Sequence, residues 1–145
     1  MARQRESLSE LAFMERELSW LADEAAGRMT DPDVAEHLRD LRDDHENAAA
    51  RLGEALEDAG GEAGVPGELR ESVRALQRGV RHAHDADGVV AAMLDAERAG
   101  LASYESALET GLPEETGRLV RERLAQARGR VGFLAEVAPE MLPRR

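Results

Sequence analysis

Apolar residues recur along most of the chain in alternating steps of three and four, which is the spacing of one buried face of an α-helix packed in a bundle. No stretch of useful length shows the two-residue alternation typical of a β-strand. The pattern predicts four long helices and one shorter helix between the second and third of them, over residues 6–29, 32–58, 68–84, 88–109 and 114–137. We therefore expect an all-α protein with a single domain over residues 1–145.

Turn signals group the long helices into two hairpins. The stretch TDPD at residues 30–33 supplies a capping side chain, a proline for the first helical position and an acid for the first turn. Pro113, followed by two glutamates, repeats this arrangement. Between the hairpins, the glycine- and proline-rich stretch AGGEAGVPG precedes the shorter helix. A connection of this length allows a crossover, after which the second and third long helices run parallel.

A glutamate interrupts the apolar stripe of the first helix, where the pattern calls for a leucine. Glu15 follows Leu8 and Leu11 in the stripe, and a shift of 82 residues lays Glu15 on Glu97 in the third long helix. Counting from the hairpin turns places both glutamates near mid-bundle, in one layer with Asp44 or His45. A buried carboxylate without a partner is costly, so something must compensate the charge of Glu15 and Glu97.

Three compensating partners stay open. A metal ion could be held by Glu15, Asp44, His45 and Glu97. The guanidinium of Arg128, beside the apolar stripe of the last helix, could instead serve as a buried counterion for both glutamates. In the third case the layer is open to water and the acids are simply solvated.

A complete two-metal site lacks half of its ligands. Bundle cores that hold two iron or two manganese ions use one Glu from each of two helices and Glu-x-x-His from each of the other two. Glu15 and Glu97 match the first half, but no acid stands three residues before any histidine of this chain. The last helix, with the stretch RLAQARGRVGF, offers no ligand at that level.

With Tyr104 seven residues after Glu97, the chain resembles the ferritin-like superfamily, in particular its rubrerythrin-type branch. The segments AARLGEALEDAGGEA, RALQRGV and LDAERAGLASYESALETGLPEETGRLV resemble an uncharacterised bacterial family of ferritin-like bundles. The resemblance implies a ferritin-like four-helix bundle of two hairpins, with Tyr104 beside the site. It favours a degenerate, non-catalytic di-metal site and a binding or structural, stress-related role. The alternative is an iron- or manganese-dependent oxidoreductase or iron-handling protein.

The composition of the chain limits the kinds of partner that it can bind. The chain has no cysteine, which excludes disulfides and thiol chemistry, and its formal net charge of −11 argues against nucleic acid and anionic membranes. No apolar run could cross a membrane and the N-terminus lacks a signal-peptide core, so we expect a soluble, cytoplasmic protein. The acid excess leaves open an adaptor that docks a basic protein, and a homo-oligomer also stays open. A solvated acidic surface is the simplest interpretation of that excess.

Overall fold

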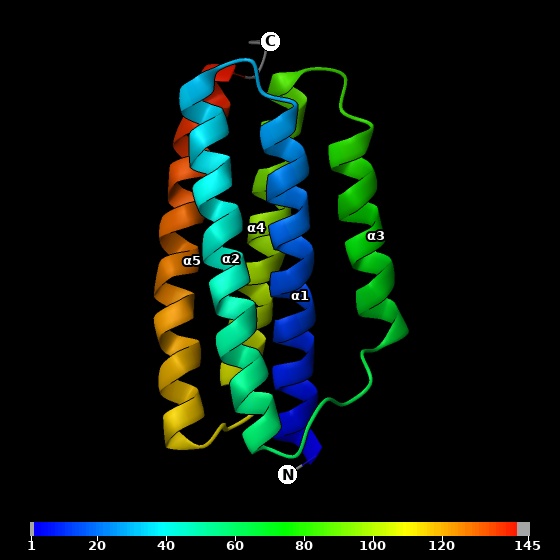
Figure 1. Ribbon diagram of the computed structural model, residues 1–145, viewed down its shortest axis with the longest axis vertical. Coiled ribbons are helices and arrows are strands. Elements are labelled where there is room, and N and C mark those ends of the chain that lie inside the picture. The colour runs from blue at the N-terminus through cyan, green and yellow to red at the C-terminus, as the bar shows by residue number, and fades with distance from the viewer. Residues whose placement is uncertain (1, 142–145) are drawn as a thin grey trace.

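The computed structural model describes residues 2–141, and every regular element in that range is a helix (Figure 1). The prediction of an all-α protein is therefore confirmed. The five helices are α1 (Ala2–Gly27), α2 (Pro32–Asp58), α3 (Gly67–Arg81), α4 (Ala86–Leu108) and α5 (Glu114–Met141). Over this range no helix combines the length and apolar character needed to cross a bilayer.

Local sequence signals explain where the helices begin and end. The Asp31 side chain accepts a hydrogen bond from the Asp33 amide at 2.9 Å and caps α2, whose first residue is Pro32. Asp85 caps α4 in the same way, through the Gly88 amide at 2.8 Å. After α2 the chain turns through Gly60 and Gly61, at φ 110° and 96°, which only glycine adopts easily. α3 ends at Arg81, three residues before the predicted boundary.

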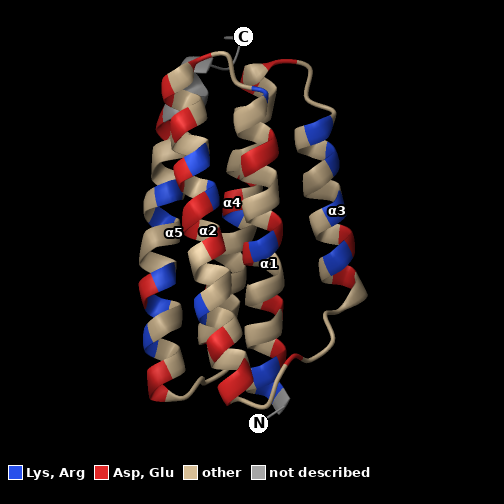
Figure 2. Cartoon of the chain, viewed as in Figure 1, with Lys and Arg blue, Asp and Glu red and all other residues tan. Residues whose placement is uncertain are grey.

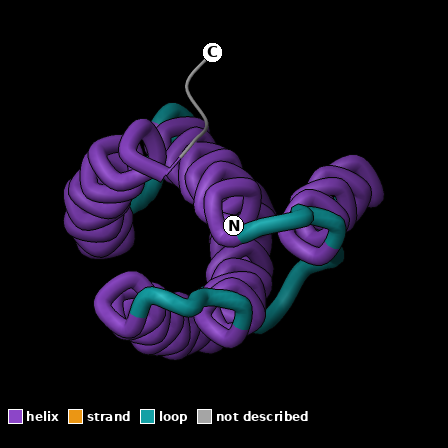
Figure 3. The backbone as a smooth tube through the Cα atoms, turned by 90° about the horizontal axis from the view of Figure 1, so that it is seen from above, coloured by secondary structure: helices purple, strands orange, loops and turns teal. Residues whose placement is uncertain are grey.

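The chain returns along the outside of the bundle between α2 and α4. At one end, Arg5 near the start of α1 donates to the Gly61 carbonyl at 3.1 Å. At the other end, Arg28 just after α1 donates to the carbonyls of Val80 and Ala83. α3 therefore runs parallel to α1 along its flank, and α2 and α4 both start at the same end and run in the same direction (Figure 1). Seen from above, α3 stands outside the group formed by the other four helices (Figure 3).

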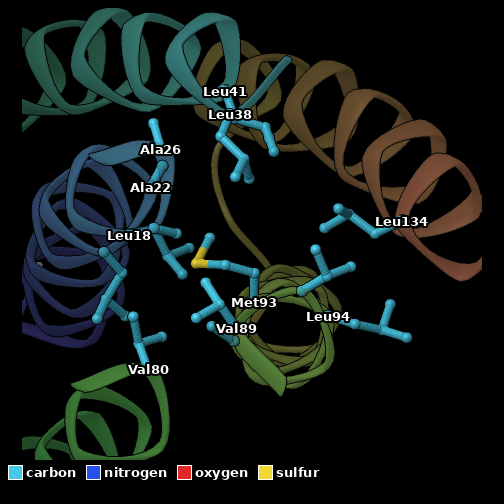
Figure 4. Packing of buried hydrophobic residues seen from close by; sticks show 14 of the residues in the cluster. Leu18, Ala22, Ala26, Leu38, Leu41, Val80, Val89, Met93, Leu94 and Leu134 are labelled. Carbon is cyan, nitrogen blue, oxygen red and sulfur yellow. The ribbon is translucent and has the colours of Figure 1, made fainter. Parts of the chain in front are cut away.

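Two apolar clusters fill the interior. The first contains Leu18, Leu38, Met93 and Leu134, and Figure 4 shows how these side chains converge from α1, α2, α4 and α5. The second lies toward the other end of the bundle and is built from Leu8, Leu11, Ala12, Leu52, Leu56, Tyr104, Ala107, Val120 and Leu124. On α1, α2 and α4 the residues between the two clusters include buried polar side chains.

Two contacts between helices shape the middle of the bundle. A Cβ atom added to Gly100 would lie 2.9 Å from the Leu18 Cδ1 atom, so this glycine lets α4 approach α1 closely. α2 and α5, by contrast, touch over a much shorter stretch than the partners in each hairpin. Polar and aromatic side chains bridge that seam. The pairs are His37 with Phe133, Asp44 with Arg130, and Arg51 with Glu122.

Candidate functional site

Three charged or polar side chains meet between the two apolar clusters. Glu15 on α1, His45 on α2 and Glu97 on α4 each occupy a position in the apolar stripe of their helix, and all three are buried. The structure thus brings together three of the four residues that the sequence proposed as metal ligands. Counting residues from the hairpin turns works here because antiparallel helices rise by the same amount per residue from a shared turn.

The His45 imidazole bridges the two carboxylates. Its Nδ1 atom lies 2.6 Å from Glu15 Oε2, and its Nε2 atom lies 2.6 Å from Glu97 Oε1. Tyr104 on α4 donates its hydroxyl proton to the other Glu15 oxygen at 2.6 Å. A histidine can donate from both nitrogens only when it is protonated, so this arrangement selects an imidazolium between two carboxylates. Such short distances are typical of charge-assisted hydrogen bonds.

The electrostatic surroundings stabilise those charges. Burial alone would lower the pKa of His45, but the Glu97 charge and the hydrogen bonds to Glu15 and Glu97 raise it from 6.5 to about 9. Burial alone would raise the pKa of Glu15, but His45, Tyr104 and Arg123 together lower it below 4.5. Burial and the neighbouring Glu15 carboxylate raise the pKa of Tyr104. At neutral pH the layer therefore holds a charged histidine, a charged Glu15 and a neutral tyrosine.

Asp44, the fourth proposed ligand, does not join this group. Its side chain is 56% exposed, and its charged neighbour is Arg130, whose Nη1 atom is 3.6 Å away. The reason is helix geometry, because consecutive residues of a helix point in different directions. His45 faces the interior, so Asp44 lies toward the α2–α5 seam.

The prediction that Arg128 faces the two glutamates is wrong. The Arg128 side chain is 61% exposed, and its Nη2 atom lies 3.8 Å from the Glu105 carboxylate. Two other arginines of α5 provide the positive charge. Arg130 is only 9% exposed, with its Nε atom 3.7 Å from Glu97 Oε2, and Arg123 is buried and acts electrostatically on Glu15.

A second reading of the α5 pattern could have found these arginines. The predicted stripe passes through Val120, Leu124, Ala127, Val131 and Leu134. A second stripe with the same steps of three and four is equally regular. It contains Arg123 instead of Leu124 and Arg130 instead of Val131. That stripe passes through Val120, Arg123, Ala127, Arg130 and Leu134.

Arg130 and Arg128 offer a matched pair of variants. We expect Arg130→Leu to lower the free energy of unfolding by about 2 kcal/mol, because Glu97 loses the cation beside its Oε2 atom. Arg128→Leu should change it by less than about 0.5 kcal/mol, because this surface pair is exposed and screened. Urea unfolding followed by circular dichroism measures both. Equal losses in the two variants, or a larger loss for Arg128→Leu, would contradict this assignment.

The residues in the layer do not fit a two-metal centre. Both nitrogens of His45 are already hydrogen-bonded to carboxylates, so neither offers a free lone pair. At the level where the fourth helix of such a centre supplies ligands, α5 presents the cations Arg123 and Arg130. Across residues 3–136, whose side chains the structure describes, no group of three or more His, Asp or Glu is arranged to hold a metal ion. Glu97 Oε2 accepts no hydrogen bond from the described residues, but the Arg130 Nε atom lies 3.7 Å from it, so a cation of the protein already stands beside this oxygen.

The chemistry open to this layer is therefore narrow. It can hold a proton on His45 and keep opposite charges together away from water. The three central residues are buried, so a dissolved substrate cannot reach them without an opening of the bundle. Such an arrangement orients and stabilises helices. The chain matches no protein-family model and no curated protein, so its role is inferred from its own residues.

Proposed function

We propose that this protein is a ferritin-like bundle in which a layer of protein charges has taken the place of a di-metal centre, and that it acts as a binding or structural protein. The observation that carries this proposal is the His45 imidazole, hydrogen-bonded at 2.6 Å to both Glu15 and Glu97. In this arrangement the side chain of α2 supplies the positive charge that a metal would otherwise bring to the two glutamates.

The course of the chain supports the ferritin-like part of the proposal. α1 and α2 form one hairpin, α4 and α5 form the other, and the segment with α3 crosses the length of the bundle between them (Figure 1). Bundles with one long crossover include the ferritin-like folds. The single glutamates of α1 and α4, Glu15 and Glu97, occupy equivalent places in the two hairpins.

Charge balance supports the non-catalytic part. With His45 protonated, it joins Arg123 and Arg130 as three cations around the two buried carboxylates, and the partly exposed Asp44 supplies a further negative charge. Because the cations of the protein already balance these carboxylates, a divalent ion added to this layer would leave two positive charges without a partner. An iron- or manganese-dependent oxidoreductase is therefore the weaker candidate. A layer whose charges already balance agrees better with a binding or structural role. The sequence resemblance associates that role with stress.

Metal content tests the proposal directly. The protein is expressed in medium supplemented with iron and manganese, purified without chelator and analysed by mass spectrometry for metals. We expect no stoichiometric metal, no acceleration of Fe(II) oxidation over buffer, and no shift of the thermal midpoint on adding chelator. Stoichiometric iron or manganese that disappears in a Glu97→Ala variant would refute the proposal and establish the metal-dependent alternative.

A further inference from the structure

Trp20 on α1 is the one large hydrophobic side chain that lies exposed among the described residues, with 75% of its surface accessible. A single exposed apolar side chain is common on proteins. Trp20, however, lines an open groove of about 660 Å³ formed by α1, α2 and α3. This volume lies within the range of ligand-binding sites. We call this feature the Trp20 groove.

The Trp20 groove carries excess negative charge. Four carboxylates and two arginines line it, namely Asp23, Glu24, Asp43, Glu46, Arg42 and Arg81. Arg42 lies 2.7 Å from Asp23 and 3.1 Å from Asp43, and Arg81 lies 3.2 Å from Glu24. Four carboxylates against two arginines leave a net charge of −2 in the groove, and Glu46 takes part in no ion pair within the described part of the chain. Figure 2 shows the acidic and basic residues along these three helices.

The indole ring of Trp20 is also free of a stacked cation. Arginine accounts for every basic residue in the chain apart from histidine, and Arg70 lies 5.3 Å from the ring centre of Phe13. Among residues 3–136, whose side chains the structure describes, no comparable contact covers Trp20. The quadrupole of an aromatic ring attracts a cation to the ring face, and carboxylates beside the ring add to this attraction through their negative charge.

We propose that the Trp20 groove binds an arginine side chain presented by an exposed segment of a partner protein. The inference rests on the binding role proposed above and names the class of partner. A guanidinium is planar, so it can stack on the indole while its N–H groups donate to a carboxylate at the groove edge, such as that of Glu46. The negative charge of the groove disfavours an anionic partner and matches a basic segment.

The groove is open to solvent and lies between three helices, which suits a side chain of an exposed peptide better than a buried small molecule. Its own arginines do not block it, because Arg42 and Arg81 are already paired with Asp23, Asp43 and Glu24. Arg42, for example, has a carboxylate on each side. The remaining negative charge and the free ring face therefore act on the same incoming cation.

The single tryptophan of the chain makes this binding directly measurable, since all indole fluorescence comes from Trp20. The probe is a short synthetic peptide of alternating glycine and arginine with blocked ends. We expect saturable change of the Trp20 emission. The same peptide with citrulline, which keeps the shape and removes the charge, should cause none.

Two double variants on α2 distinguish binding in the Trp20 groove from a general attraction of the basic peptide to the acidic protein. Asp43→Asn with Glu46→Gln removes two charges from the groove, whereas Glu54→Gln with Asp58→Asn removes two from another acidic groove that has no aromatic side chain. We expect the first pair to weaken peptide binding about tenfold and the second to change it by less than about twofold. All four positions are exposed, so both variants should fold.

Equal weakening in the two double variants, or no saturable change with the arginine peptide, would overturn the proposal. A third measurement addresses a second copy of this chain as occupant: if the protein sediments as a dimer and Trp20→Ala makes it monomeric, the groove is a self-association surface and the proposal fails. Binding of the peptide is independent of metal content. Failure of this inference and failure of the proposed function are therefore distinguishable.

Discussion

Replacing His45 with leucine is expected to lower the free energy of unfolding by about 3–5 kcal/mol at neutral pH. Glu15 and Glu97 are both buried, and each is hydrogen-bonded to the imidazole at 2.6 Å. Removing the imidazole leaves two carboxylates close together without the cation between them. Arg123 and Arg130 remain, but Arg130 Nε lies 3.7 Å from Glu97 Oε2, too far for a hydrogen bond.

The same variant should regain stability in acid. Without His45, Glu15 loses the hydrogen bond and the charge that lower its pKa, so burial beside a second carboxylate raises that pKa above the unfolded value. The folded state then binds protons more readily than the unfolded state, so stability should rise as the pH falls from about 7 to about 5.

Urea unfolding followed by circular dichroism at these two pH values is the measurement. The control is His37→Leu on the same helix, where an exposed histidine stacks on Phe133 and leucine keeps an apolar contact, so we expect a change below about 1 kcal/mol. If His45→Leu were as stable as the parent at neutral pH, the bridging imidazole would not be what compensates the glutamates.

The parent protein should lose about 3 kcal/mol of stability as the pH rises from about 6 to about 9.5. The pKa of His45 is raised from 6.5 to about 9 in the folded state. The stabilisation from a raised pKa is fully present below the unfolded value and disappears as the pH passes through the folded value. Tyr104 adds nothing in this range, because its shift acts only near and above its unfolded pKa of 10.0.

In acid the dependence of stability on pH has the opposite sign. The folded pKa of Glu15 is depressed, so its contribution is present above the unfolded value of 4.5 and is lost as the pH falls through the lower folded value. We therefore expect maximal stability between about pH 4.5 and 6.5.

Urea midpoints across this range test the profile, with His45→Gln as control, because glutamine has no titrating proton. The control should lack the alkaline decline, although it is less stable throughout. An equal decline in parent and control would assign the effect to another group.

The sequence by itself determined the helices and the layer. The predicted bounds 32–58 for α2 agree with the structure because local signals determine them. Asp31 and Pro32 begin the helix, the glycines after Asp58 end it, and the periodic apolar residues between them bury one face. The level of Glu15, His45 and Glu97 followed from residue counts, because the rise per residue of a helix is constant.

Only the tertiary structure decided which cations face the glutamates. The stripe of α5 through Leu124 and Val131 and the stripe through Arg123 and Arg130 are equally regular, and the two differ by a rotation of the helix about its axis. Packing against α4 and the attraction of buried carboxylates determine that rotation, and both depend on residues far away in the chain. For α2 the steps from Leu41 to His45 and on to Ala48 already placed His45 in the stripe, and the structure shows that Asp44, which the sequence kept as a second candidate, turns toward Arg130 and solvent.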